Sequence, residues 1–139
     1  MADRRQCLKD FLMSRYGVFV YGTLLDADLR CEVCGRSVPA APARLPDYRR
    51  YRLRNLPYPG IVAEPGAEVV GQLLDVDART LAALDRYEDS CYERRLLEVD
   101  SEAGRQRAYV YVIPQARRHL IDPRDWDLDR WRRWARRRG

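Results

Sequence analysis

Continuous runs of β-branched and aromatic residues, each ended by turn-forming residues, predict most of the strands of this 139-residue chain. The clearest run is Gly17-Val18-Phe19-Val20-Tyr21, which stops at Gly22 and so predicts a buried strand followed by a sharp turn. Residues 92–99 and 107–113 predict two more strands, and the turn-rich stretch between them predicts a hairpin. Shorter strands are expected over residues 48–54, 60–64 and 69–76.

Apolar residues at helical spacing predict the helices of the chain. One or two turns are expected within residues 1–15, where Leu8, Phe11 and Leu12 form a short apolar stripe. A weak helix over residues 24–34 ends at Gly35, and Asp77 caps a helix from residue 78 to about 88. A last helix is expected over about residues 127–136, with Leu128, Trp131 and Trp134 on the face that docks on the domain.

About six strands and a few helices joined by short connections predict an α+β domain built on a curved, mainly antiparallel sheet. We divide the chain into an N-terminal extension, residues 1–16, and one domain, residues 17–139, that includes the basic C-terminal helix. No apolar run approaches the roughly 20 residues that a membrane span needs. Phe11-Leu12-Met13 is too short for the core of a signal peptide, so we expect a soluble cytoplasmic protein without a membrane partner.

The net charge of +5 comes from one segment. Residues 115–139 hold nine Arg and four Asp, whereas the first 114 residues balance to zero. Because the basic character is confined to the tail, we expect no nucleic-acid partner. An amphipathic tail that contacts a membrane or RNA remains an alternative to a tail helix docked by its Trp face.

Cys31 and Cys34 form a C-x-x-C pair. A structural zinc site needs four ligands, and Cys7, Cys91 and the single histidine, His119, supply no second pair. Small apolar thiols at i, i+3 suit a shared buried helix face, so we expect reduced cysteines and no metal site.

The turn after the first strand, residues 21–24, is a candidate binding loop. A buried strand that ends in Gly-Thr presents successive backbone N–H groups, which can hold a carboxylate or a developing oxyanion. Gly22 permits close approach because it has no Cβ. Many strands end in Tyr-Gly-Thr only to make a turn, and that alternative stays open.

Glu88 is the candidate proton carrier. Leu81, Leu84 and Glu88 stand at i, i+3 and i+7, so the carboxylate continues an apolar stripe. It also lies at a helix C-terminus, where the macrodipole disfavours a negative charge by roughly 0.3–1 kcal/mol. Partial burial acts in the same direction, and a carboxyl with a raised pKa is suited to move a proton at neutral pH. The alternative is that Glu88 lies past the helix end and reaches water or an Arg.

Five short motifs in order resemble the γ-glutamylcyclotransferase-like, or AIG2-like, family. Tyr21-Gly22-Thr23-Leu24 after Val-Phe-Val resembles its YGTL signature, and residues 70–76 resemble its V-x-G-x-L/V-x-x-V strand. Residues 84–88, with Tyr92-Glu93-Arg94 following, are similar to its L-D-x-[YF]-E…Y-x-R stretch. Residues 108–112 match the closing A-x-x-Y strand, and Trp126-Asp127 matches the usual tail, so the resemblance covers about residues 17–134.

The resemblance implies a small mixed, mainly antiparallel β-barrel with flanking helices and a cavity at one side. It also implies binding of a γ-glutamyl group by backbone amides of Tyr21, Gly22, Thr23 and Leu24, with Glu88 as general acid and base. Tyr92 and residues 56–60 are then cavity walls. Asp89 stands where family members often have Gly, and a second carboxylate there is expected to raise the pKa of Glu88.

The implied reaction is intramolecular and uses no cofactor. The free α-amine of a small γ-glutamyl compound attacks its own γ-carbonyl, which gives 5-oxoproline and releases an amine. The sequence leaves open which amine is released and the oligomeric state. The competing interpretation is a non-catalytic module on the same fold, with the basic tail as its contact surface.

Overall fold

Two very long strands, β2 (Ala40–Leu53) and β3 (Pro59–Asp77), form the frame of the sheet in the computed structural model, which describes residues 4–5 and 14–138. They pair antiparallel from Ala40 with Leu74 to Arg52 with Pro59. The strands expected over 60–64 and 69–76 are therefore one strand, although Pro65-Gly66 between them is typical of a turn. The register shifts opposite this point, and the Gly66 N–H donates to the Asp47 carboxylate over 2.9 Å, so the hairpin bends without ending.

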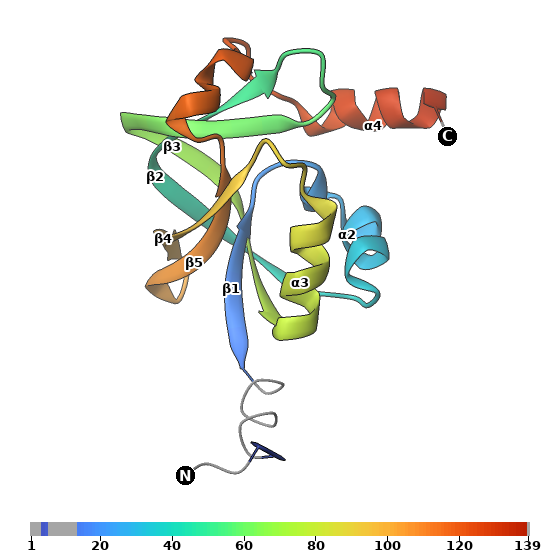
Figure 1. The fold of residues 1–139 in the computed structure, drawn as a ribbon, viewed down its shortest axis with the longest axis vertical. Coiled ribbons are helices and arrows are strands. Elements are labelled where there is room, and N and C mark those ends of the chain that lie inside the picture. The colour runs from blue at the N-terminus through green and yellow to red at the C-terminus, as the bar shows by residue number, and fades with distance from the viewer. Residues whose placement is uncertain (1–3, 6–13, 139) are drawn as a thin grey trace.

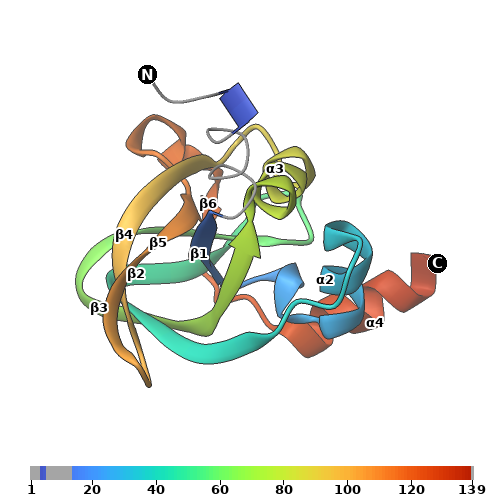
Figure 2. The same ribbon diagram turned by 90° about the horizontal axis from the view of Figure 1, so that it is seen from below.

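The other strands complete a six-stranded, mainly antiparallel sheet. β1 (Arg15–Val20) pairs antiparallel with β3 and makes a single parallel pair, Val18 with Tyr109, with β5 (Gly104–Val112). β5 forms the expected hairpin with β4 (Glu93–Ser101), and β4 touches β2 over two residue pairs. Because β2 also pairs with β3, the order β3-β1-β5-β4-β2 returns to its start and the sheet nearly closes into a barrel (Figure 2). The short β6 (Ile121–Asp122) pairs antiparallel with the last two residues of β2, Arg52 and Leu53.

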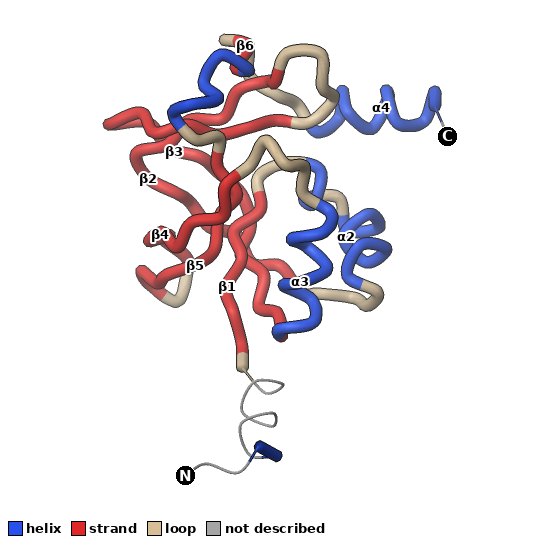
Figure 3. Tube along the Cα trace, viewed as in Figure 1, coloured by secondary structure: helices blue, strands red, loops and turns tan. Residues whose placement is uncertain are grey.

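The core consists of an interior layer and a helix-covered layer. Phe19, Leu45 and Ile61 lie among the buried side chains inside the curved sheet. Two helices, α2 (Ala27–Cys34) and α3 (Ala78–Tyr87), lie on one side of β1 (Figures 1 and 3), where buried side chains of α3 pack on those of β1 and β3. The fold is therefore the expected α+β class, with flanking helices on a nearly closed, mainly antiparallel sheet.

Side-chain capping explains where α2 and α3 begin. Asp26 accepts a hydrogen bond from the Leu29 N–H, and Asp77 accepts one from the Thr80 N–H, as the sequence predicted for α3. The segment expected as one helix over 24–34 is divided into a short 3₁₀ turn, η1 (Thr23–Leu25), and α2. Gly35 ends α2 in the left-handed region with φ of 72°.

The shared buried face expected for Cys31 and Cys34 is wrong. Cys31 is exposed, and only Cys34 is partly buried against the core. Positions i and i+3 are about 60° apart around a helix axis, and here the edge of the buried surface runs between them. The helix expected within residues 1–15 rests on Leu8, Phe11 and Leu12, which lie outside the described residues, so this helix and the division at residue 16 stay predictions.

The tail corrects a second expectation. After a 3₁₀ segment, η2 (Gln115–Leu120), the chain forms α4 (Leu128–Arg138), which extends away from the sheet (Figure 1). No residue of α4 is buried, and Trp134 is 38% exposed, so the helix does not dock by a buried Trp face. The buried tryptophan is Trp126, which precedes the helix. An ion pair from Arg132 to Asp26, 2.8 Å long, connects α4 to the start of α2.

Across the described part of the chain, no helix is both long enough and apolar enough to cross a bilayer.

Trp126 should therefore contribute most of the stability that the tail provides. It is 5% exposed and its indole N–H donates to the Pro57 carbonyl over 2.8 Å. We expect Trp126→Ala to lower the free energy of unfolding by about 3–5 kcal/mol, because it leaves a cavity and an unpaired carbonyl. Trp134→Ala is the matched control and should cost about 0.5 kcal/mol or less. Urea unfolding of both variants tests this, and equal losses would contradict it.

Candidate active site

A cavity of about 430 Å³ opens where β1 ends, beside the C-terminus of α3. Its wall combines four parts of the chain that are far apart in sequence. It is lined by residues 19–24, 58–59 and 86–90, together with Tyr92 and Tyr111. All the residues that the sequence proposed for the site, Tyr21, Gly22, Thr23, Leu24, Glu88 and Tyr92, thus border one cavity.

The turn after β1 is held from several sides. The Tyr21 side chain is buried and its hydroxyl donates to the Tyr111 carbonyl, while Arg50 donates to the Tyr21 carbonyl over 2.9 Å. The Thr23 and Tyr87 hydroxyls are 2.8 Å apart, which joins the turn to the end of α3. The position of the turn relative to α3 is therefore defined by the packing of both elements.

Close approach requires glycine at position 22. A Cβ there would lie 2.9 Å from the Cγ of Pro59. The hydrogen bonds within the turn are donated by the Leu25 and Asp26 N–H groups. Within the described residues, the N–H groups of Gly22, Thr23 and Leu24 make no hydrogen bond. This cavity wall therefore has backbone donors that are free for a ligand.

Glu88 is the residue at which α3 ends. Its backbone N–H still donates to the Leu84 carbonyl over 3.0 Å, but its own backbone is extended. The side chain therefore leaves the helix surface and borders the cavity, where it is half-buried. No described residue forms a hydrogen bond or ion pair with its carboxylate. Glu88 therefore lies past the last residue of α3, as the alternative interpretation had it, but it pairs with no described Arg.

The pKa of Glu88 is raised to about 7, first because burial disfavours the charged form and then because Asp89 and Asp85 are close and negative. Burial and the charge of Asp89 are the causes that the sequence predicts, and Asp85 is a further one that only the structure shows. A carboxyl group with a pKa near 7 is present in both protonation states at neutral pH.

The two neighbouring carboxylates have hydrogen-bond partners of their own. The Tyr58 hydroxyl donates to Asp89 over 2.5 Å, which holds the pKa of Asp89 below its usual value and keeps it ionised. Asp85 accepts from the Tyr111 hydroxyl over 2.6 Å and pairs with Arg94 over 2.7 Å. Glu88 therefore differs from both neighbours, because no described residue forms a hydrogen bond with its carboxylate.

Tyrosine side chains form much of the cavity wall. Tyr92 is held by a hydrogen bond from its hydroxyl to the Pro59 carbonyl, so it acts here as a rigid wall. Of the expected segment 56–60, only Tyr58 and Pro59 line the cavity. Tyr87 and Tyr111 also line the cavity, and neither is predicted from the sequence although both stand inside its motifs, because only the folded chain shows which tyrosines border the cavity.

Among the residues that the structure describes, no three His, Cys, Asp or Glu side chains are grouped so that they could hold a metal ion. A ligand in the cavity would meet three kinds of group: backbone N–H donors, an unpaired carboxyl group and tyrosine side chains.

Comparison with known proteins identifies the family of the chain. The family model described as "Gamma-glutamyl cyclotransferase, AIG2-like" matches residues 18–128. Protein AIG2 C of Arabidopsis thaliana is 34% identical over 125 residues, which cover 84% of this chain and 72% of that protein. A Vibrio cholerae protein with a provisional gamma-glutamylcyclotransferase name is 34% identical over 110 residues, which cover 78% of this chain and 93% of that protein.

A solved structure agrees with this relationship. A solution structure of an Arabidopsis thaliana protein has a TM-score of 0.69 and 30% identity, and it covers 90% of this chain and 77% of that one. The resemblance inferred from the five motifs is thus confirmed. The chain belongs to the gamma-glutamyl cyclotransferase, AIG2-like family.

Proposed function

We propose that this protein is a γ-glutamylcyclotransferase-type enzyme that converts a small γ-glutamyl amine or γ-glutamyl amino compound into 5-oxoproline and a free amine. The observation that carries the proposal is the position of Glu88: an unpaired carboxyl group with a pKa near 7 borders the same cavity as the open backbone donors of residues 22–24. Membership of the family and the name of the Vibrio cholerae relative support this reaction class.

In this proposal Glu88 carries one proton through the whole reaction. The substrate α-amine attacks the γ-carbonyl carbon, a C–N bond forms, and the ionised Glu88 accepts the proton that the amine loses. The tetrahedral intermediate then collapses, the original C–N bond breaks, and Glu88 returns the proton to the leaving nitrogen. Substrate atoms and protons balance, because the products are 5-oxoproline and the neutral amine.

The binding loop has two roles in this mechanism. The N–H groups of Gly22, Thr23 and Leu24 are available for the negative charge that the substrate carries or that develops on the γ-oxygen. The tyrosine walls, among them Tyr58, Tyr87 and Tyr92, restrict the substrate to folded conformations that bring its amine near its own carbonyl. Such positioning lowers the barrier of an intramolecular reaction because it removes an entropic cost before the chemical step.

Glu88→Gln should fold normally and lose turnover. The amide has nearly the same size and can still form hydrogen bonds, so packing and KM should change little. It cannot accept and return a proton, so kcat should fall by about 100-fold or more. The measurement is 5-oxoproline release from a panel of γ-glutamyl compounds, with a thermal melt of each protein.

Asp85→Asn is the matched control on the same helix. Asp85 connects α3 to β4 and β5 through Arg94 and Tyr111, so its loss should lower stability by about 1 kcal/mol and affect kcat far less than Glu88→Gln does. Equal kcat in Glu88→Gln and the parent would remove the acid–base role. A parent protein inactive on every γ-glutamyl compound would favour a non-catalytic binding module.

The pH dependence of kcat/KM should change when the charge of Asp89 is removed. Asp89 raises the pKa of Glu88, so Asp89→Asn should lower that pKa. The base must be ionised, so kcat/KM rises as the pH passes the pKa of Glu88, and the variant's rise should move to lower pH. Glu98→Gln, which removes an exposed carboxylate of β4, should leave the profile unchanged. If kcat/KM of Asp89→Asn rises at the same pH as that of the parent, the assignment of this rise to Glu88 is contradicted.

A further inference from the structure

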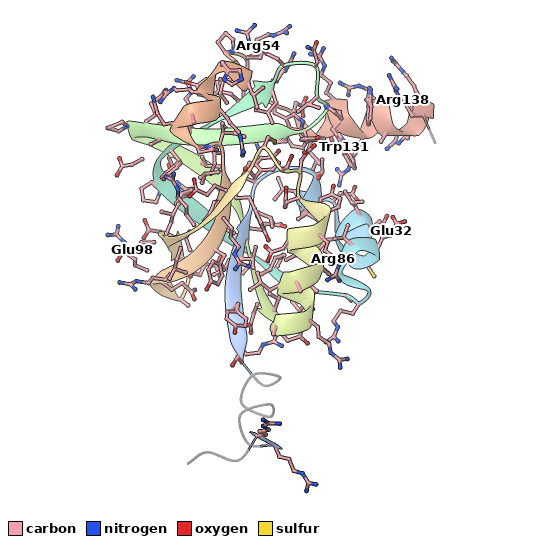
Figure 4. The ribbon with its side chains drawn as sticks, in the orientation of Figure 1. Glu32, Arg54, Arg86, Glu98, Trp131 and Arg138 are labelled. Carbon is pink, nitrogen blue, oxygen red and sulfur yellow. The ribbon has the colours of Figure 1, made fainter. Side chains whose placement is uncertain are left out.

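A second hollow, of about 420 Å³, lies between α4 and the loop that joins β2 to β3. We name it the tail groove. On one side it is lined by the loop residues Asn55, Leu56 and Pro57, and on the other side by α4. Figure 4 shows Trp131 where α4 meets the body of the molecule and Arg138 at the far end of the helix. The residues of α4 that line the tail groove run from Arg130 to Arg138.

The groove face of α4 carries both aromatic and cationic side chains. Arg130, Trp131, Trp134 and Arg138 line the tail groove, and their spacing places them along one side of a helix. Trp131 is half-buried and Trp134 is 38% exposed. The Arg138 guanidinium lies 4.9 Å from the centroid of the Trp134 ring. Aromatic surface and positive charge are thus interleaved on this face.

Most of the positive charge on α4 is not neutralised. Arg132 is paired with Asp26, but Arg130 has no ion pair or hydrogen bond with any described residue. Asp127 also borders the groove, and its carboxylate accepts from the Asp129 N–H. Four Arg and two Asp line the tail groove, so the charge of its lining is positive.

We propose that the tail groove binds single-stranded nucleic acid, with bases stacked on Trp131 and Trp134 and phosphates held by Arg130 and Arg138. Exposed aromatic rings beside cations are the combination that single strands require, because every base has a face that stacks and every nucleotide has a charge. The sequence predicted no nucleic-acid partner because its basic charge is confined to the tail, but it left open a tail that contacts RNA in place of a tail helix docked by its Trp face. Because α4 has no buried residue, that alternative is the one proposed.

The geometry favours a strand over a membrane surface. A helix that lies on a bilayer presents its apolar face outward to the lipid. Here Trp131 and Trp134 face a groove whose other wall is protein, and the remaining surface of α4 carries Arg133, Arg136 and Arg137. A narrow chain of nucleotides can enter such a groove, whereas a lipid surface cannot.

The test uses a pair of double variants with the same change of charge. Arg130→Gln with Arg138→Gln removes two groove cations, and Arg133→Gln with Arg137→Gln removes two exposed cations of α4 outside the groove. Binding of a fluorescein-labelled oligothymidylate of about 12 nucleotides is measured by anisotropy at several salt concentrations. The groove variant should reduce the slope of log affinity against log salt by about 1.4, and the other variant should change it much less.

Stacking is tested separately. Trp134→Ala should weaken oligothymidylate binding by about tenfold or more, while Trp134→Phe should retain most of it. A DNA duplex of the same length should bind less tightly because its bases are not exposed for stacking. Thermal melts establish that each variant is folded.

Several results would overturn the proposal: no binding of the parent protein to the oligonucleotide, equal losses in the two double variants, or equal affinity for duplex and single strand. Binding to phosphatidylglycerol vesicles without oligonucleotide binding would assign the surface to a membrane instead. None of these measurements depends on the cyclotransferase reaction.

Discussion

The bend in the β2–β3 hairpin is the constraint on which the candidate active site depends. One end of β3 pairs with β1 through Val20 with Gln72, and so positions the turn that follows β1. The other end begins at Pro59, which lies so close to Gly22 that a Cβ there would clash. A straight hairpin could not reach both sides of this turn. The contact between Asp47 and Gly66 accompanies the bend: four residues of β3, 64–67, lie opposite Asp47 alone, and the three extra residues let the strands change direction while they stay paired.

The electrostatics of the site depend on which of its three carboxyl groups have hydrogen-bond partners. Asp85 and Asp89 each accept a hydrogen bond from a tyrosine hydroxyl, so both carboxylates are held in place. Glu88 has no such partner among the described residues, and burial together with the nearby Asp89 and Asp85 raises its pKa to about 7. The same two carboxylates that tune Glu88 also join α3 to the sheet and to the loop before β3. Stability and proton affinity are therefore coupled at this site.

The loop between β2 and β3 separates two different surfaces. Tyr58 and Pro59 border the active-site cavity, whereas Asn55 and Pro57 border the tail groove. Trp126 holds this loop from the tail side through the Pro57 carbonyl. The acidic cavity and the basic groove thus share this loop as a wall, and their opposite charge suits them to different ligands.

The local pattern of the sequence determined most of the elements. The apolar run before Gly22, the cap at Asp77 and the hairpin of β4 and β5 were predictable because each depends on neighbouring residues. The motifs around residues 21–24 and 84–88 also placed Tyr21 and Glu88 correctly at the ends of their elements. These features arise from backbone preference and from hydrophobic spacing, which a single chain segment carries by itself.

Only the tertiary structure decided what lies across from these residues. Pro65-Gly66 is typical of a turn in isolation, and it became a bend within β3 because Asp47 of the paired strand completes the irregularity. The helical spacing of Trp131 and Trp134 predicted a face of α4 but not what covers it, and the buried tryptophan proved to be Trp126. The contribution of Asp85 to the pKa of Glu88 likewise depends on distance in space. Packing partners and electric fields come from residues remote in sequence, so no local pattern contains them.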